Sequence, residues 1–219
     1  MCGRFTLRAP GAEIARHFGL EGDVDLDPRW NIAPTQEVAT VRQREDGLAL
    51  TSMRWGLVPS WAPDLARGAR LINARSETVH EKPSFAKAFA ERRCLVPTDG
   101  FFEWSGEKGA RQAWFFHLGD HALFSFAGIW ECWEGPDGPL ETVAILTTRA
   151  NSLVEPRHPR MPVILRQDDH SDWLGGGLGN EALFQPFPPS EMAAIPVGSR
   201  VHSPRNEGPE CILALAGEN

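Results

Sequence analysis

Apolar and aromatic residues fill the segment Cys94-Leu95-Val96-Pro97-Thr98-Asp99-Gly100-Phe101-Phe102-Glu103-Trp104. Residues of these types are enriched in strands, so we expect extended backbone over residues 94–104. Similar stretches recur along the chain, and turn residues separate them. The predicted strands cover residues 37–43, 48–58, 69–76, 94–104, 112–118, 122–132, 141–148 and 161–166.

Helices are few in this pattern. A short helix is expected over residues 10–19, where Ile14 and Phe18 are four residues apart and Gly19 can end the helix. Further helices are expected over residues 83–92, residues 168–175 and part of residues 180–186. The sequence therefore predicts the α+β class: one β-rich domain over residues 1–219, with a curved, barrel-like antiparallel sheet as its core and a few peripheral helices.

The composition limits the possible functions. A hydrophobic fraction of 42% is ample for a core, but no apolar run approaches the roughly 18 residues of a membrane span. Arg4, Arg8 and Glu13 interrupt any signal-peptide core. The four cysteines are scattered without a C-x-x-C pair, which argues against a zinc site or a disulfide framework and fits a reducing cytoplasm. They are Cys2, Cys94, Cys132 and Cys211. We expect a cytoplasmic protein with no membrane contact, no metal and no cofactor.

The net charge of −7 argues against broad binding of nucleic acid. Any contact with DNA must therefore come from a local basic patch.

The chain opens with Met1-Cys2-Gly3-Arg4-Phe5. If Met1 is removed, Cys2 carries a free α-amine beside a thiol, and both groups are partly in their nucleophilic forms near neutral pH. Such an aminothiol can attack an acyl group. It can also condense with an aldehyde, because the amine forms a Schiff base that the thiol then closes to a thiazolidine ring. The alternative is that Cys2 is a small buried residue of an N-terminal strand.

Two strand-like segments carry polar candidates. Within residues 71–77, the strand period places Asn73 and Arg75 on one face, where an amide and a guanidinium can hold a sugar hydroxyl and a phosphate. From the residues alone, the reading as solvated polar residues on an open sheet face is favoured over this one. Glu103 lies in an aromatic run, so it is either partly buried, with a raised pKa suited to proton transfer, or directed to solvent from an edge strand.

Two further segments carry candidate residues, one rich in proline and the other containing two tryptophans. In residues 155–162, three prolines surround His158 and would hold this potential acid–base group in a fixed pose, with Arg157 and Arg160 favouring an anionic ligand. In residues 55–61, Trp55 is expected in the core and Trp61 at the surface. An exposed indole there could stack on a base.

In their order along the chain, these segments resemble the SOS-response-associated peptidase family of abasic-site-processing proteins. The matching strings are Met1-Cys2-Gly3-Arg4-Phe5, Trp30-Asn31-Ile32-Ala33-Pro34-Thr35, Trp55-Gly56-Leu57-Val58-Pro59-Ser60-Trp61, Ile72-Asn73-Ala74-Arg75-Ser76-Glu77-Thr78, the Asp99-to-Trp104 stretch, His158-Pro159-Arg160-Met161-Pro162 and Val201-His202-Ser203-Pro204-Arg205-Asn206. Each string is short, but their ordered co-occurrence over nearly the whole chain is specific. The family fold, a β-rich α+β domain with a positively charged groove for single strands, agrees with the strand pattern.

The resemblance implies a chemistry. Family members use the mature N-terminal cysteine to capture the ring-opened aldehyde of an abasic site in single-stranded DNA as a thiazolidine crosslink. The catalytic residues would be Cys2 as nucleophile, Asn73 orienting the sugar or the amine, Glu103 as acid and base, and His158 in sugar opening and crosslink reversal. The residues expected to bind or shape the DNA groove are Arg4, Asn31, Pro34, Trp61, Arg75, Arg160 and Arg205. The family name further implies thiol autopeptidase activity. The resemblance also implies a nucleoid-associated bacterial monomer, with replication-fork proteins as partners.

Two positions depart from the family pattern. Ala62 stands where a second aromatic residue often follows Trp61, and His202 stands where asparagine is frequent. Two other classes of function stay open. Glutamine amidotransferases also begin Met-Cys-Gly, and a noncatalytic single-strand-binding module would not need Cys2.

Overall fold

The structure is a computed structural model, and it describes residues 2–107, 109–176 and 181–215. Its strands are β1 (Phe5–Leu7), β2 (Arg29–Ile32), β3 (Glu37–Arg44), β4 (Gly47–Trp55), β5 (Asn73–Arg75), β6 (Arg93–Thr98), β7 (Gly100–Ser105), β8 (Gln112–Leu118), β9 (Phe124–Gly135), β10 (Gly138–Arg149), β11 (Arg160–Pro162), β12 (Ile164–Leu165) and β13 (Met192–Val197). The helices are α1 (Gly11–Phe18), α2 (Ala86–Glu91) and α3 (His170–Leu174). Short 3-10 helices are η1 (Leu65–Arg70), η2 (Gly119–His121), η3 (Gln167–Asp169), η4 (Glu181–Phe184), η5 (Pro189–Glu191), η6 (Ser199–His202) and η7 (Pro209–Cys211).

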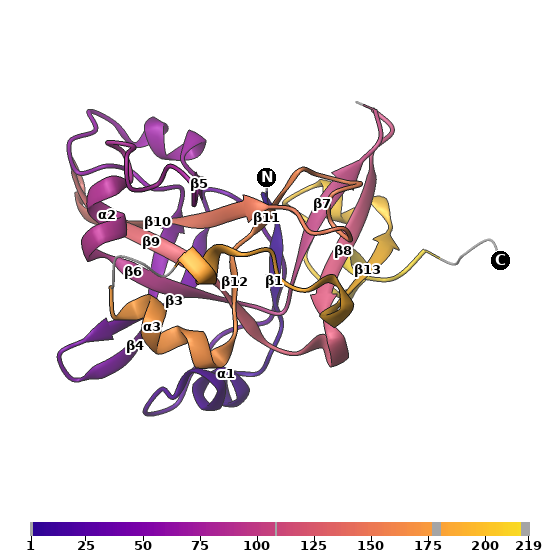
Figure 1. Cartoon of the computed structure of the whole chain (residues 1–219), viewed down its shortest axis with the longest axis horizontal. Coiled ribbons are helices and arrows are strands. Elements are labelled where there is room, and N and C mark those ends of the chain that lie inside the picture. Colours follow the sequence, from indigo (N-terminus) through magenta and orange to yellow (C-terminus); the bar gives the residue numbers. More distant parts are fainter. Residues whose placement is uncertain (1, 108, 177–180, 216–219) are drawn as a thin grey trace.

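Five strands close into a barrel. Its order is β10-β4-β3-β6-β9, and β9 pairs back with β10. The pairing is antiparallel except where β10 runs parallel to β4 and to β5. A second sheet, in the order β13-β8-β7-β1-β2, stands beside the barrel (Figure 1). The structure thus confirms the expected β-rich α+β class with a barrel-like core and few helices.

The two sheets meet at Asp99, which divides the expected strand over residues 94–104 into β6 in the barrel and β7 in the second sheet. Asp99 is buried. Its carboxylate accepts hydrogen bonds from the Thr6 hydroxyl, from the backbone N–H groups of Arg8 and Ala9, and from Arg8 Nε. Several donors satisfy this buried charge, and together they fasten the end of β1 to the junction between the sheets.

The core fills the barrel and continues under the helices. Phe5, Trp55, Phe126 and Ile145 are among its fully or almost fully buried side chains. Helix α1 buries Ile14 and Phe18 and ends at Gly19, whose φ of 63° is left-handed. None of the helices that the structure describes has the length and apolar composition needed to cross a bilayer.

Some elements differ from the sequence prediction. Residues 69 and 70 belong to η1 (Leu65–Arg70) instead of a strand, and only β5 remains of the strand expected over residues 69–76. The reason is a tertiary contact: a Cβ at Gly68 would lie 2.5 Å from the carbonyl oxygen of Gly56, so the two backbones meet closely. The strand expected over residues 161–166 is divided into β11 and β12, and the helix expected within residues 180–186 is the short η4, with residue 180 outside the described part. Strands β1, β2 and β13 were not expected.

Candidate active site around Cys2

Cys2 lies three residues before β1, the strand that begins at Phe5 in the second sheet. The backbone N–H of Phe102 donates to the carbonyl oxygen of Arg4 (2.9 Å), so the segment before β1 continues alongside β7 toward Glu103. The Cys2 side chain is fully buried, and its thiol lies 3.7 Å from the carbonyl oxygen of Arg4. Burial, reinforced by the nearby charge of Glu103, raises the pKa of the Cys2 thiol. The thiol is therefore held protonated, and it needs a base to become a nucleophile.

Glu103, whose charge acts on the Cys2 thiol, is the candidate for that base. It is 4% exposed on β7, opposite Trp114 of β8. Burial raises the pKa of Glu103 to about 7. A carboxyl with this pKa is present in both its acid and base forms at neutral pH, which is what a group that both gives and takes protons requires.

Asn73 reaches the same place from the barrel. It begins β5, which pairs with β10 through Asn73 and Ile145. Its Nδ2 donates to the carbonyl oxygen of Cys2 (2.8 Å). Its Oδ1 is buried and has no hydrogen-bond partner among the described residues. One end of the amide thus fixes the Cys2 backbone, while the other can receive a hydrogen bond from an amine or a sugar hydroxyl.

His158 lies in the turn that leads into β11. His158 Nδ1 lies 3.0 Å from the backbone nitrogen of Arg160 and 3.1 Å from its carbonyl oxygen, so the tautomer decides whether Nδ1 accepts from the one or donates to the other. Burial lowers the pKa of His158, so the ring is neutral at physiological pH. Strands β11 and β5 lie on opposite sides of β10, and Figure 1 shows both near the start of the chain.

Sequence reasoning missed Asn151, which shapes this turn. Its Oδ1 accepts from the backbone N–H groups of Leu153 and Val154 (3.1 and 3.0 Å), and its Nδ2 donates to the carbonyl oxygen of Phe187 (2.7 Å). Arg157 of the same turn covers the Trp114 ring at 3.9 Å. An asparagine before a turn is a signal that could have been read from the sequence.

The four arginines expected at DNA differ in their availability. Arg75 and Arg205 are exposed, and no ion pair of either guanidinium is found among the described residues. Arg160 is held by Glu77. Arg4 donates to Asn31 Oδ1 (2.7 Å) and to the carbonyl oxygen of Val201 (2.8 Å), and burial lowers its pKa.

The other residues expected in the DNA groove also differ in their exposure to solvent. Asn31 is fully buried, and its Nδ2 donates to the carbonyl oxygens of Ser203 and Asn206, so it supports Arg4 from behind. Pro34 is half-buried in the turn before β3. Trp61 is 54% exposed, as expected, and Arg67 lies 4.8 Å from its ring, while Trp55 is in the core, also as expected.

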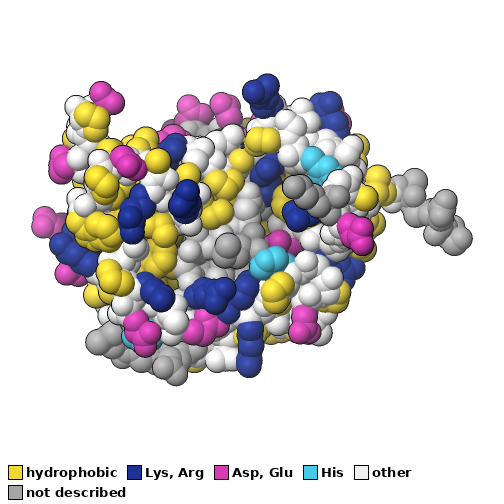
Figure 2. Space-filling model, turned by 90° about the horizontal axis from the view of Figure 1, so that it is seen from above, with side chains coloured by type: hydrophobic (Ala, Val, Ile, Leu, Met, Phe, Trp, Pro, Cys, Tyr) yellow, Lys and Arg dark blue, Asp and Glu magenta, His cyan; other side chains and the backbone are white. Residues whose placement is uncertain are grey.

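A cavity of about 690 Å³ opens beside Arg4. Its walls are Arg4, Trp104, Gly109, Ala110, Arg111, Ser199 and His202. The sequence did not single out Trp104 or Arg111. Seen from above the view of Figure 1, the molecule has a hollow with Lys and Arg side chains around it (Figure 2). Arg4 and Arg111 are the two positively charged side chains in the described wall of this cavity.

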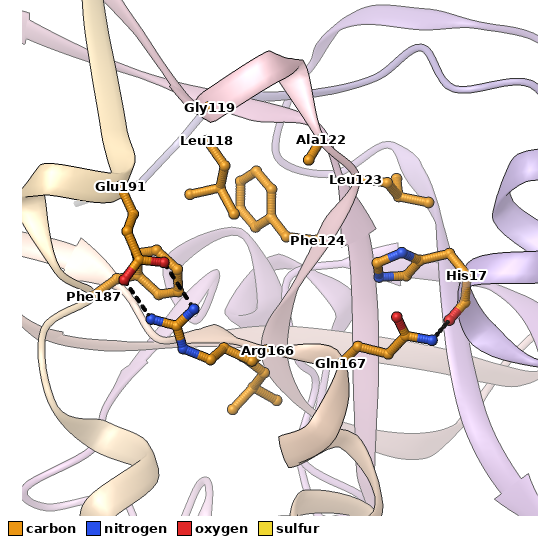
Figure 3. A pocket seen from close by; sticks show the side chains of 11 residues that line it. His17, Leu118, Gly119, Ala122, Leu123, Phe124, Arg166, Gln167, Phe187 and Glu191 are labelled. Carbon is orange, nitrogen blue, oxygen red and sulfur yellow. Dashed lines mark hydrogen bonds and ion pairs between the residues drawn. The ribbon is translucent and has the colours of Figure 1, made fainter.

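A second cavity, of about 430 Å³, lies under η2. The Arg166–Glu191 ion pair stands on one of its sides, and Gln167 donates to the carbonyl oxygen of His17 on another (Figure 3). No group of three potential metal ligands is found in the part of the chain that the structure describes.

Comparison with known proteins decides the family. The model of the SOS response associated peptidase (SRAP) family matches residues 1–204. The chain belongs to the SRAP family. It is 39% identical over 221 residues to the abasic site processing protein YoqW of Bacillus subtilis (strain 168), covering 97% of this chain and 99% of that protein. It is 34% identical over 193 residues to the abasic site processing protein HMCES of Gallus gallus, covering 76% of this chain and 57% of that protein.

A solved structure agrees with this one in fold. A crystal structure of a protein from Bacteroides thetaiotaomicron superimposes with a TM-score of 0.87 at 27% identity, covering 98% of this chain and all of that one. The family resemblance drawn from the sequence motifs is thus confirmed, and the SRAP fold places Cys2, Asn73 and Glu103 together.

Proposed function

We propose that this SRAP protein captures abasic sites in single-stranded DNA through a covalent bond to Cys2. The observation that carries the proposal is the meeting of Cys2 with two partners: Glu103, whose pKa is raised to about 7, and Asn73, whose amide holds the Cys2 carbonyl. The names of YoqW and HMCES describe them as abasic site processing proteins. This supports abasic DNA as the substrate here.

The reaction begins after removal of Met1. The ring-opened sugar presents an aldehyde, and the Cys2 amine adds to its carbon to give a carbinolamine. Loss of one water yields the Schiff base. The Cys2 thiol then adds to the same carbon, the C–S bond forms, and the thiol proton passes to the amine nitrogen. The product is a thiazolidine, and the balance is one water lost with no oxidant or reductant required.

Three side chains serve these steps. Glu103 in its acid form protonates the departing hydroxyl of the carbinolamine, and in its base form it takes the proton of the buried thiol. Asn73 uses its buried Oδ1 to orient the amine. Neutral His158 receives or returns the proton of the sugar oxygen, so it assists both opening of the sugar and reversal of the crosslink.

Arg75 and Arg205, here called the basic rim, position the DNA strand. Arg75 and Arg205 are exposed and can bind phosphates. Arg4 lines the adjoining cavity. The exposed ring of Trp61 can stack on a base. A single strand suits this rim because its bases are unstacked and reach the side chains directly. A monomeric state, a cytoplasmic location, recruitment by replication-fork proteins and autopeptidase activity remain predictions.

Denaturing electrophoresis with two matched oligonucleotides tests the proposal. One strand carries a single abasic site and the other is intact. Protein with Met1 removed should give a slow-migrating band with the abasic strand alone, and Cys2→Ala should give none. A glutaminase assay in parallel separates the amidotransferase alternative. Glutamine hydrolysis without a crosslink would overturn the proposal.

A further inference from the structure

Three charged side chains meet over the end of β10. Arg75 lies opposite Thr147 on one side of the strand, and Arg160 lies opposite Arg149 on the other side. Glu77, two residues beyond Arg75, reaches across to Arg160. These three side chains carry two positive charges and one negative charge, and Arg149 of β10, opposite Arg160, adds a third positive charge nearby.

The geometry of the ion pair between Glu77 and Arg160 matches that of a bidentate arginine–phosphate contact. Arg160 Nη1 donates to Glu77 Oε1 (2.6 Å), and Nη2 donates to Oε2 (2.8 Å), as a guanidinium grips two oxygens of a phosphate. Nη2 also donates to the carbonyl oxygen of Thr147 (2.5 Å), and Nε is buried. The paired edge of Arg160 is thus fully occupied, so a phosphate cannot take that edge while Glu77 stays in place.

Glu77 is nevertheless able to leave. Its side chain is 51% exposed, whereas that of Arg160 is 15% exposed and anchored to the barrel. The hydrogen bond from Arg160 and the nearby charge of Arg75 hold the pKa of Glu77 below its ordinary value, so it stays charged at neutral pH. An exposed carboxylate can rotate into solvent at modest cost. The anchored guanidinium would stay behind and accept another anion.

We propose that Glu77 is an internal competitor of the DNA backbone phosphate for Arg160, and that it weakens reversible binding of undamaged strands. The inference rests on the proposed function, because it assigns the anion to single-stranded DNA. Binding of a phosphate exchanges one bidentate pair for another, so Arg160 adds little net affinity. Lasting attachment then depends on the covalent bond at Cys2, and strands without an abasic site dissociate.

The test measures reversible binding of an intact single-stranded oligonucleotide by fluorescence anisotropy across a salt series. Glu77→Gln should bind several-fold more tightly than the wild type. Its salt slope should steepen by about 0.7, the value for one added phosphate contact on a single strand. Glu81→Gln is the matched control, because Glu81 is also exposed and lies four residues away. This control should change binding little.

A double-mutant cycle with Arg160→Ala separates competition from simple loss of negative charge. The gain from Glu77→Gln should disappear in the Arg160→Ala background. An equal gain in both backgrounds, or weaker binding by Glu77→Gln, would overturn the inference. The crosslinking assay is scored separately. A wild type that does not crosslink while the cycle behaves as expected refutes the proposed function alone. If neither the wild type nor Glu77→Gln binds DNA, both ideas fail.

Discussion

Glu103 is buried, and its carboxyl gains or loses its proton near neutral pH. Its replacement by Gln keeps the size of the side chain and removes the titrating group. We expect Glu103→Gln to slow crosslinking by about 10²-fold or more, since well-placed acid–base groups contribute about 10²–10⁴-fold. The wild-type rate should change around pH 7, where Glu103 titrates, and the mutant rate should lack this change.

Single-turnover crosslinking across pH measures this effect, with binding to an abasic analogue that lacks the aldehyde measured in parallel. A mutant defect that weaker binding explains in full would remove Glu103 from the chemistry.

The same carboxyl affects stability. The pKa of Glu103 is raised from its ordinary value of 4.5 to about 7 by burial, so the unfolded chain releases the proton first as pH rises. The contribution of Glu103 to the free energy of unfolding is thus complete below about pH 4.5 and is lost as pH rises through 7. The slope is at most about 1.4 kcal/mol per pH unit. Urea unfolding at several pH values should show Glu103→Gln gaining stability relative to the wild type between pH 4.5 and 7. Parallel curves would contradict the buried titration.

At the scale of elements, two histidines join helices α1 and α3 to the barrel. His170 stacks on Phe18 and lies 2.9 Å from the Ser125 hydroxyl, and His17 lies 5.9 Å away, centroid to centroid. Burial, and secondarily the charge of His17, lowers the pKa of His170 to about 4. Burial also lowers the pKa of His17. Both rings are therefore packed in their neutral forms.

We predict that the attachment of these helices is acid-sensitive. The unfolded chain binds the His170 proton below about pH 6.5, whereas the folded chain resists it down to about 4, so stability is lost as pH falls through this window. His170→Gln should flatten the dependence of the urea midpoint on pH between 6.5 and 4. Hydrogen exchange should show α1 and α3 opening first in the wild type. Equal slopes for the two proteins would rule out this role.

The sequence predicted the elements whose patterns are long and local. Strands β3, β8, β9 and β10 carry extended runs of apolar and β-branched residues, and α1 has its own stop signal at Gly19. Strand β1 is only three residues long, and β13 contains Pro196, so neither gave a clear signal. Residues 69 and 70 were wrongly assigned to a strand because the contact between Gly68 and Gly56, which accompanies η1, is tertiary. Likewise, motifs pointed to Cys2, Asn73 and Glu103, but no local pattern reveals that Glu77 holds Arg160 or that Asn31 holds Arg4.

At the scale of the whole molecule, the chain carries a net charge of −7, while Arg75 and Arg205 are exposed to solvent. Contacts between exposed arginines and DNA phosphates release counterions from the DNA and do not read its sequence. We therefore expect Arg75→Ala to weaken binding of single strands of any sequence and to reduce the salt slope by about 0.7. Anisotropy titrations over a salt series measure this. Lys87→Ala, an exposed change on α2, is the control and should leave the slope unchanged. An unaltered slope for Arg75→Ala would place Arg75 outside the DNA path.

Intact mass spectrometry of the adduct tests the central claim most directly. The protein lacking Met1 is mixed with a single strand that holds one abasic site, and the product is denatured and weighed without reduction. We predict a species equal to protein plus DNA minus one water, stable without added hydride, and absent for Cys2→Ala. Cys2→Ser should give at most a labile adduct, because its hydroxyl forms a weaker ring. A stable adduct of the same mass from Cys2→Ala, or from protein that retains Met1, would contradict capture by the Cys2 aminothiol.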